Sequence, residues 1–373
     1  MDFSLTDEQR AITDLATKIL TDRCTLERLK AIEGSTDRYD RELWGEFAKA
    51  GLLGAPLPED LEGSGGGFLE ICLVLEQQGR RVAPIPLLPT VVSAAMPLAR
   101  FGSAEQRQHY VPGVTKGSIL LTAALEEADT SSRAPVTTAK REGKLWRLNG
   151  VKVGVPVAEA AAAVLVPART ADGQIGVFIV DPKAPGVVTA RQDTMNWDAQ
   201  YSLELSNVMV SADAVLGSLA AGSEILNWMV DRTTVGLCAI AAGVCQEAVR
   251  LTAEYASNRK QFDKPIAMFQ AVGQRMADAY IDNEAVNLTM WQAASRLAED
   301  MPSPKEIATA KFWAAEGGSR IGHAALHIHG GISIDIDYPI HRYFLWLKQL
   351  ESTLGAATPH LAVLGEILAG EPA

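Results

Sequence analysis

The apolar residues of this 373-residue chain change their period twice, and that order limits the folds the chain can adopt. Residues 1–117 repeat apolar side chains at helical spacing, as at Ile12, Ala16 and Ile19. Thr6, followed by two acidic residues, is a typical cap for that first helix. The first third of the chain is therefore expected to form an N-terminal helical domain.

The segment 118–218 alternates apolar and polar residues as strands do. Residues 145–148 and 151–153 flank Asn149-Gly150, a pair typical of a two-residue type I′ hairpin turn. Two continuous apolar runs further on predict buried strands: 164–166 and 177–180. We expect a small middle β-barrel domain here.

Residues 219–373 return to helical spacing. The stretch 230–255 has few helix breakers, and Cys238 and Cys245 lie seven apart, on one face of that helix as small core residues. Further helices are expected at 269–297, 304–326 and 359–368. Together they predict a C-terminal four-helix bundle. The expected fold class is α+β, mostly α.

The composition excludes several kinds of partner. With 34 basic and 45 acidic residues the net charge is −11, which argues against nucleic acid. The four cysteines show no paired metal or disulfide spacing. The N-terminus reads as an amphipathic helix and not as a signal peptide, and no apolar run reaches the roughly 18 residues of a membrane span. We expect a cytoplasmic protein without membrane contact.

Two motifs in the last third of the chain contain residue types that often contact ligands. The first runs from Arg259 through Phe262 to Phe269-Gln270. The second is His327-Ile328-His329-Gly330-Gly331, followed by Tyr338-Pro339. Arg259 offers permanently charged donors suited to a diphosphate. The two glycines let backbone amides approach a ligand closely. Taken by themselves, these residues are more simply explained as an arginine at a helix end and a glycine that caps a helix.

With the helix–strand–helix order, these motifs resemble the flavin-binding signature of the acyl-CoA dehydrogenase family, and the resemblance covers nearly the whole chain. It implies an FAD lying across a subunit interface, with its diphosphate and adenine held by the helical bundle of one subunit. It implies these cofactor-binding residues: Arg259, Gln261, Phe262, Phe269, Gln270, His327, Gly330 and Gly331. Asp263 departs from the pattern, since the family usually has glycine there.

His323 and His327 are four residues apart, which is a possible two-ligand spacing for a metal on one helix face. No glutamate joins them in a His-Glu-x-x-His pattern, and no third ligand is evident. The sequence therefore predicts no metal site. His327 is instead expected to fill the polar position that the family has before its Gly-Gly pair.

The other half of the family's site is not present in this sequence. The hydroxyl residue of its Thr-Glu-Pro turn, which bonds the flavin ring, falls at Ala124 or Leu125. Its flavin-packing tryptophan is replaced by Gly154, and the hydroxyl residue two positions later by Pro156. The resemblance therefore implies a β-domain that has lost its flavin platform.

The catalytic base of the family is also missing. Dehydrogenation needs a carboxylate over the α-carbon of the CoA thioester. The family's Glu-Gly-Thr triplet falls here on Leu354-Gly355-Ala356, which retains only the glycine. Two nearby acids, Glu351 and Asp231, are the remaining candidates in this chain, and each is more simply explained as a solvated acid near a helix end.

Losses at one half-site and retention at the other favour a division of labour. The chain resembles the FAD-site-incomplete subunit of actinobacterial two-subunit acyl-CoA dehydrogenases that act on sterol side chains. That implies an α2β2 tetramer with a catalytically complete partner, an acyl-CoA substrate and an electron-transfer flavoprotein as acceptor. One alternative is a homo-oligomeric dehydrogenase with Glu351 or Asp231 as base. Another is a non-enzymatic scaffold, against which the retained Arg259 and Gln270 argue.

Overall fold

The computed structural model describes residues 4–370, which fall into two compact units. A helical unit comprises the segments up to Ala31, Cys72–Ala83 and from Thr234 on. A sheet unit comprises Ile32–Ile71 and Pro84–Thr233. Along the chain, helices precede the first strand and follow the last long one, as expected. The three-domain division remains a prediction, and its ends at 1–3 and 371–373 lie outside the described residues.

The first helix, α1 (Asp7–Arg23), begins at the cap that the sequence predicts. The hydroxyl of Thr6 accepts a hydrogen bond from the amide of Gln9, and the Gln9 side chain accepts from the Thr6 amide. This reciprocal capping box satisfies two amides that the helix leaves unpaired. Ala16 is buried as the helical period requires.

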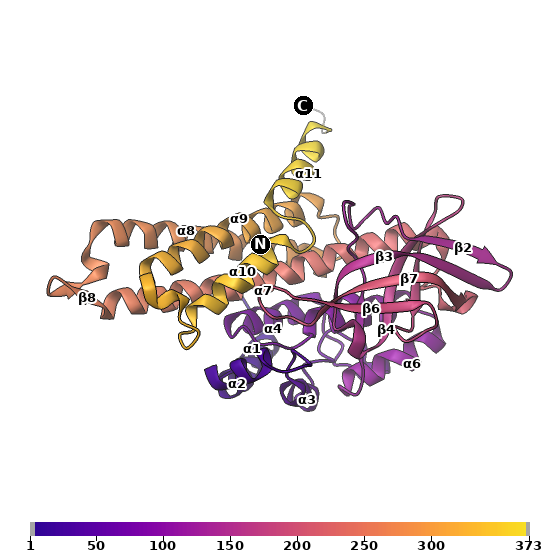
Figure 1. Cartoon of the computed structure of the whole chain (residues 1–373), viewed down its shortest axis with the longest axis horizontal. Helices are drawn as coiled ribbons and strands as arrows, with labels where there is room; N and C mark the ends of the chain where they lie inside the picture. Colours follow the sequence, from indigo (N-terminus) through magenta and orange to yellow (C-terminus); the bar gives the residue numbers. More distant parts are fainter. Residues whose placement is uncertain (1–3, 371–373) are drawn as a thin grey trace. The chain divides into compact units, whose positions relative to one another are not determined.

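Three long helices of the helical unit lie side by side (Figure 1): α7 Gly222–Asn258, which belongs to this unit from Thr234 on, α8 Gln270–Ala298 and α9 Pro304–His329. Two shorter helices follow, α10 Ile340–Ser352 and α11 Ala357–Ala369, and α11 points away from the others in Figure 1. The bundle is thus confirmed, with one helix more than predicted. The additional helix is α10. Its residues Ile340, Tyr343, Leu347 and Leu350 are buried at helical spacing. The sequence contains this apolar pattern, so the helix could have been predicted.

Small residues allow a close contact between α7 and α4 (Phe68–Arg80). A Cβ atom on Gly79 would collide with the carbonyl of Ile240, and one on Gly243 with the carbonyl of Glu76. The two backbones therefore approach each other at glycines. Cys238 and Cys245 are buried on α7, as expected.

One expectation about α7 needs correction. Within the described residues, the stretch Leu219–Asn258 contains an 18-residue window of mean hydropathy 1.3 and is long and apolar enough to cross a membrane by length and composition alone. The chain was expected to contain no such stretch. The apolar window of this helix is 78% buried inside the protein. A buried core helix meets the same criteria of length and hydropathy as a membrane-spanning helix.

The sheet unit holds one seven-stranded sheet with the order β1-β4-β2-β3-β7-β6, and β5 pairs with β4. The strands are β1 Leu120–Ala123, β2 Thr138–Glu142, β3 Leu145–Pro156, β4 Ala161–Thr170, β5 Ile175–Val180, β6 Val187–Gln192 and β7 Gln200–Ser211. Its helices are α3 Arg41–Lys49, the π-helix η2 Leu88–Ala95, α5 Met96–Phe101 and α6 Ala104–Thr115. The middle β-domain is therefore confirmed as a sheet, with no pairing among the described strands that closes it into a barrel.

The predicted hairpin turn at Asn149-Gly150 is wrong. Both residues lie inside the continuous strand β3, where the register with β7 shifts between Leu148 and Gly150. The Asn149 side chain accepts from the amide of Asn207, and a Cβ on Gly150 would collide with Thr137. Pairing with two neighbouring strands overrides the local turn preference, and the real β2–β3 turn lies at residues 143–144.

Candidate functional site

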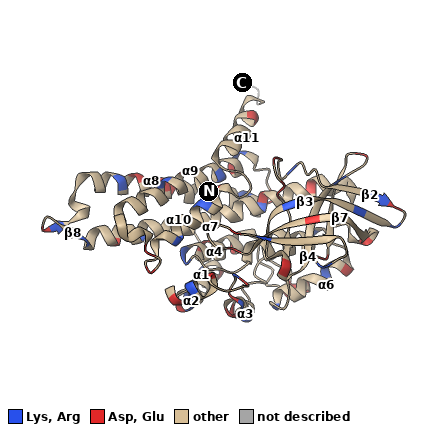
Figure 2. Ribbon diagram, in the orientation of Figure 1, with Lys and Arg blue, Asp and Glu red and all other residues tan. Residues whose placement is uncertain are grey.

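The first predicted motif forms a small hairpin between α7 and α8. Its strands are β8 Lys260–Gln261 and β9 Lys264–Pro265. The turn between them places Phe262 and Asp263 in the left-handed region, at φ of 52° and 61°. Asp263 therefore adopts the backbone conformation that glycine, the family's usual residue, adopts without strain. Figures 1 and 2 show the hairpin beyond the ends of α7 and α8, with basic residues along it.

The hairpin presents a cation that no other group engages. Arg259 follows the last turn of α7, and its amide donates to the carbonyl of Tyr255. Its guanidinium is exposed and has no hydrogen bond or ion pair within residues 4–370. Gln270, the first residue of α8, is exposed in the same way. Both side chains are thus available to an external ligand.

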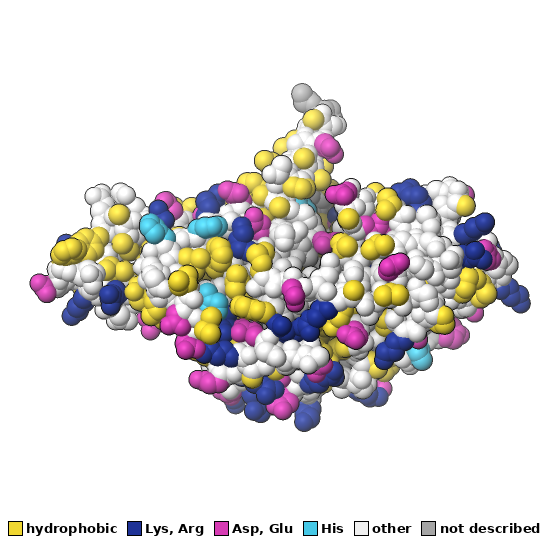
Figure 3. Space-filling model, viewed as in Figure 1, with side chains coloured by type: hydrophobic (Ala, Val, Ile, Leu, Met, Phe, Trp, Pro, Cys, Tyr) yellow, Lys and Arg dark blue, Asp and Glu magenta, His cyan; other side chains and the backbone are white. Residues whose placement is uncertain are grey.

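Aromatic side chains accompany this cation. Phe262 is 86% exposed at the hairpin tip, and its ring meets that of Phe269 edge-on at 6.2 Å between centroids. The ammonium of Lys264 lies 4.5 Å from the centroid of the Phe269 ring. Figure 3 shows hydrophobic side chains gathered over the part of the chain that carries β8. An exposed aromatic surface next to a free arginine suits a ligand with a planar base and an anionic group.

The second motif ends α9 beside the first one. Gly330 caps the helix at φ 65° and ψ −141°, a conformation that strongly favours glycine. A Cβ atom on Gly330 or Gly331 would meet nothing within 4 Å, so the space above both residues is open. The ring of Tyr255 stacks on His329 at 4.4 Å, and its hydroxyl donates to the His329 carbonyl at 3.3 Å. Tyr255 therefore links the loop Gly330-Gly331 to the end of α7, where the amide of Arg259 donates to the Tyr255 carbonyl.

The two histidines at the end of α9, His327 and His329, have different surroundings. His329 is buried, its Nδ1 lies 2.8 Å from the carbonyl of Ala325, and burial lowers its pKa. His327 is exposed, and its Nδ1 lies 2.6 Å from the guanidinium of Arg275. Among residues 4–370, no three His, Cys, Asp or Glu side chains converge as metal ligands would.

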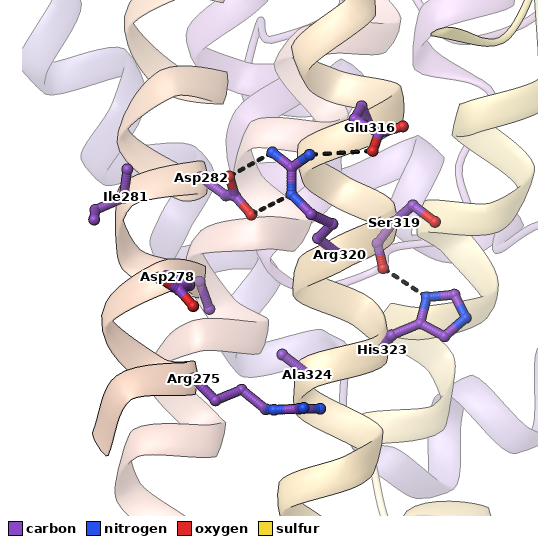
Figure 4. Close-up of a pocket in the computed structure, with 10 residues that line it drawn as sticks. Arg275, Asp278, Ile281, Asp282, Glu316, Ser319, Arg320, His323 and Ala324 are labelled. Carbon is purple, nitrogen blue, oxygen red and sulfur yellow. Dashed lines mark hydrogen bonds and ion pairs between the residues drawn. The ribbon is translucent and has the colours of Figure 1, made fainter. Parts of the chain in front are cut away.

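A pocket of about 580 Å³ lies between α8 and α9 near His327 (Figure 4). The guanidinium of Arg320 bonds both carboxylate oxygens of Asp282, at 2.6 and 2.8 Å, and reaches Glu316 at 3.1 Å. Arg275 extends from α8 to a position beside Ala324 of α9. Sequence reasoning did not find Arg275, because its partner lies 52 residues further along the chain.

The residues at which the flavin-bonding hydroxyl was expected lie in the sheet unit. Ala124 and Leu125 are buried, so neither faces outward as expected for the hydroxyl residue of the family. The outward position belongs to Glu126, which pairs with Val153. Its carboxylate lies 3.5 Å from where a Cβ on Gly154 would stand. The assignment of the hydroxyl position to Ala124 or Leu125 remains a prediction, and the residue that follows them is an acid.

The carboxylate of the next acid, Glu127, is buried and bonded to other groups of the protein. Its carboxylate forms a 2.5 Å ion pair with Lys152 and accepts from the amides of Val136 and Thr137 at 2.6 and 3.0 Å. The two charged side chains are 3% and 0% exposed. Glu127 thus ties the loop after β1 to the middle of β3, and its oxygens are not available to a ligand.

Both candidate bases are engaged by neighbours. Asp231 accepts from Arg133 at 2.5 Å, and the same guanidinium reaches Asn227 at 3.0 Å. Glu351 pairs with Lys348 at 2.6 Å near the end of α10. The two acids belong to different units. Neither has the solitary, poorly solvated setting that tunes a carboxylate for proton abstraction.

Comparison with known proteins agrees with this arrangement. Residues 6–118 match the acyl-CoA dehydrogenase N-terminal domain, and residues 220–368 match the acyl-CoA dehydrogenase C-terminal domain. The acyl-CoA dehydrogenase FadE27 of Mycobacterium tuberculosis is 40% identical over the full length of both chains. FadE28 of the same organism is 33% identical over 98% of each.

Solved structures show the same likeness. A chain of the ChsE4-ChsE5 complex from Mycobacterium tuberculosis superposes with a TM-score of 0.95 at 41% identity, over 100% of both chains. A chain of the Tcur3481-Tcur3483 steroid acyl-CoA dehydrogenase superposes with a TM-score of 0.91 at 44% identity, over 97% of this chain and 98% of that one. Both similar structures are complexes of two differently named chains.

Proposed function

We propose that this chain, which belongs to the acyl-CoA dehydrogenase family, is the cofactor-sharing subunit of a heteromeric dehydrogenase. The observation that carries the proposal is an asymmetry between two half-sites. Arg259 and the open Gly330-Gly331 loop are ready to receive the ADP half of FAD. The position of the flavin ring in the sheet unit instead presents Glu126 next to Gly154.

In this proposal each residue of the retained half-site has a defined task. The Arg259 guanidinium donates to the diphosphate, and the missing side chains of Gly330 and Gly331 let a second phosphate oxygen approach the backbone of this loop. The amide of Gly330 itself already donates to the carbonyl of Leu326. Gln270 bonds adenine or ribose, and the Phe262 and Phe269 rings pack against the base. When bound, FAD takes up the electrons removed from the substrate. Gln261 and His327 complete the set of donors around the nucleotide.

The partner supplies what this chain lacks. A second acyl-CoA dehydrogenase-like subunit would contribute the flavin platform, the base and the acyl pocket. In an α2β2 tetramer only two of the four interfaces would then be complete, which gives two FAD. The names of the two similar complexes support a second subunit and, for one of them, a steroid substrate. We therefore propose a CoA thioester of a sterol side chain, with an electron-transfer flavoprotein as acceptor.

Two other functions are tested by the same experiment. A homo-oligomeric dehydrogenase would use Glu351 or Asp231 as base, although both acids are already paired. A scaffold without cofactor would have no use for an unpaired Arg259 beside a glycine loop. Each of the three functions predicts a different flavin content and activity for the purified chain.

The test is to purify the chain alone and together with a dehydrogenase-like subunit encoded beside it. We expect the chain alone to be colourless and inactive toward acyl-CoA, and the mixed complex to hold two FAD per tetramer. A yellow, active homo-oligomer would establish the first alternative. A mixed complex without flavin would establish the scaffold.

A further inference from the structure

We infer that Arg275 fixes the tautomer of His327 and thereby makes this histidine a hydrogen-bond donor at the nucleotide surface. The inference rests on the proposed function, since it concerns how the same half-site receives FAD. It starts from one contact between α8 and α9, in which Nη1 of Arg275 lies 2.6 Å from Nδ1 of His327. Arg275 follows Gln270 by five residues, and His327 precedes Gly330 by three.

The chemistry of the two groups determines where the proton lies. A guanidinium in a protein is always protonated and has only donors. Nδ1 of His327 must therefore accept, which means that it carries a lone pair. The neutral imidazole then has its single proton on Nε2. His327 thus presents an N–H donor from the side of the ring that faces away from Arg275.

Two neighbouring histidines of the same helix have the opposite arrangement. Nδ1 of His323 lies 2.8 Å from the carbonyl of Ser319, and Nδ1 of His329 lies 2.8 Å from the carbonyl of Ala325. A carbonyl can only accept, so both Nδ1 atoms carry a proton. Each histidine bonds the carbonyl four residues earlier. Without Arg275, Nδ1 of His327 could donate in the same way to the carbonyl of His323, four residues earlier.

The tautomer decides whether His327 attracts or repels the cofactor. With the proton on Nε2, the ring donates to an oxygen of the diphosphate or ribose, as a glutamine amide would. With the proton on Nδ1, a lone pair faces the same oxygens. Arg275 is therefore a positioning residue that acts through His327.

A double-mutant cycle on FAD affinity of the mixed complex tests this relation. We expect Arg275→Met to weaken FAD about three- to tenfold, the equivalent of one ordinary hydrogen bond. In a His327→Gln background the same change should cost less than about twofold, because an amide donates whatever Arg275 does. Arg275→Lys, which keeps a donor without an acceptor, should retain most of the affinity. Equal losses in both backgrounds would overturn the inference.

The tautomer itself is measured by nitrogen NMR of the complex labelled at histidine. The chain has six histidines, and the His327→Gln variant identifies the signal of interest. We expect a protonated Nε2 and an unprotonated Nδ1, and the reverse in Arg275→Met. A protonated Nδ1 with Arg275 present would refute the inference. If Arg259→Ala leaves the FAD affinity unchanged, the proposed function is wrong, but the NMR result still decides the role of Arg275.

Discussion

Arg133, in the loop that follows β1, donates to the carboxylate of Asp231 on α7 at 2.5 Å. The Asp231 side chain is only 27% exposed, and the Arg133 guanidinium also holds Asn227 at 3.0 Å. A carboxylate held in this way joins a loop to a helix. This contact argues against Asp231 as the base that removes a substrate proton.

Asp231→Asn should therefore change turnover of the mixed complex by less than about tenfold, or roughly 1.4 kcal/mol. The partly exposed ion pair contributes about 1 kcal/mol or less to stability, so the variant should fold normally. The measurement is kcat at saturating acyl-CoA with the flavin content matched to the unmodified complex. A loss of several orders of magnitude with FAD still bound would identify Asp231 as the base.

Glu351 is tested in the same way, because it pairs with Lys348 at 2.6 Å. Glu351→Gln should likewise change turnover by less than about tenfold. The fold should tolerate the change, since the buried Lys311 ammonium bonds the backbone carbonyls of Leu350 and Glu351, at 2.6 and 3.1 Å, and these bonds do not depend on the Glu351 side chain. Steady-state kinetics of Glu351→Gln beside Lys348→Met, as matched control, check this. A large loss confined to the Glu351 variant contradicts our assignment of the base to the partner.

Arg259→Ala should release FAD from the mixed complex. A charge-assisted hydrogen bond contributes roughly 1.5–3 kcal/mol, so affinity should fall about ten- to a hundredfold. Arg259→Lys should recover only part of this, because an ammonium cannot reproduce the planar fork of the guanidinium. The readout is flavin absorbance after gel filtration.

The corresponding arginine of the partner is the control for Arg259. In our proposal it faces the sheet unit of this chain, where Glu126 stands at the flavin position, so replacing it should matter much less. Equal flavin loss from the two arginine variants would mean that both kinds of interface bind FAD. The division of labour would then be wrong.

The buried pair of Glu127 and Lys152 should dominate the stability of the sheet unit. Lys152→Met leaves an unpaired buried carboxylate and should cost about 3–5 kcal/mol of unfolding free energy. Adding Glu127→Gln removes that charge and leaves one amide oxygen, which can accept from either Val136 or Thr137, since these two amides bond different oxygens of Glu127. The double variant should therefore recover at least about 2 kcal/mol of the loss. Urea unfolding followed by tryptophan fluorescence measures both values, and additive losses would contradict the coupling.

The same pair predicts a pH dependence. Burial raises the pKa of Glu127, but hydrogen bonds from Lys152 and Thr137 outweigh it, so the pKa lies below its ordinary 4.5. Because the folded pKa is depressed, the unfolded chain binds the proton more readily, and stability falls as pH drops below about 4.5. The double variant Glu127→Gln with Lys152→Met should lose stability less steeply over that window. If the free energy of unfolding falls equally steeply from pH 6 to pH 3 in the unmodified protein and in the double variant, this prediction is wrong.

Much of the fold could be predicted because it depends on local signals. The Thr6 cap, the helical period of α1 and the long breaker-free α7 follow from neighbouring residues along one chain segment. The residues of the FAD motifs were also recognisable, since Arg259 and Gly330-Gly331 keep a fixed spacing within their own helices and turns. Even the helix α10 was present as a pattern, with buried apolar residues from Ile340 to Leu350.

The tertiary structure decided what depends on partners far away in sequence. Asn149-Gly150 has the local preference of a turn, but pairing with two other strands places it inside β3. The burial of both Ala124 and Leu125, and the ion pair of Glu127 with Lys152, depend on contacts of the loop after β1 with distant residues. The contact of Arg275 with His327 exists only because α8 packs on α9. Spacing along a chain carries no information about such contacts, since the energy that forms them comes from packing between helices and strands.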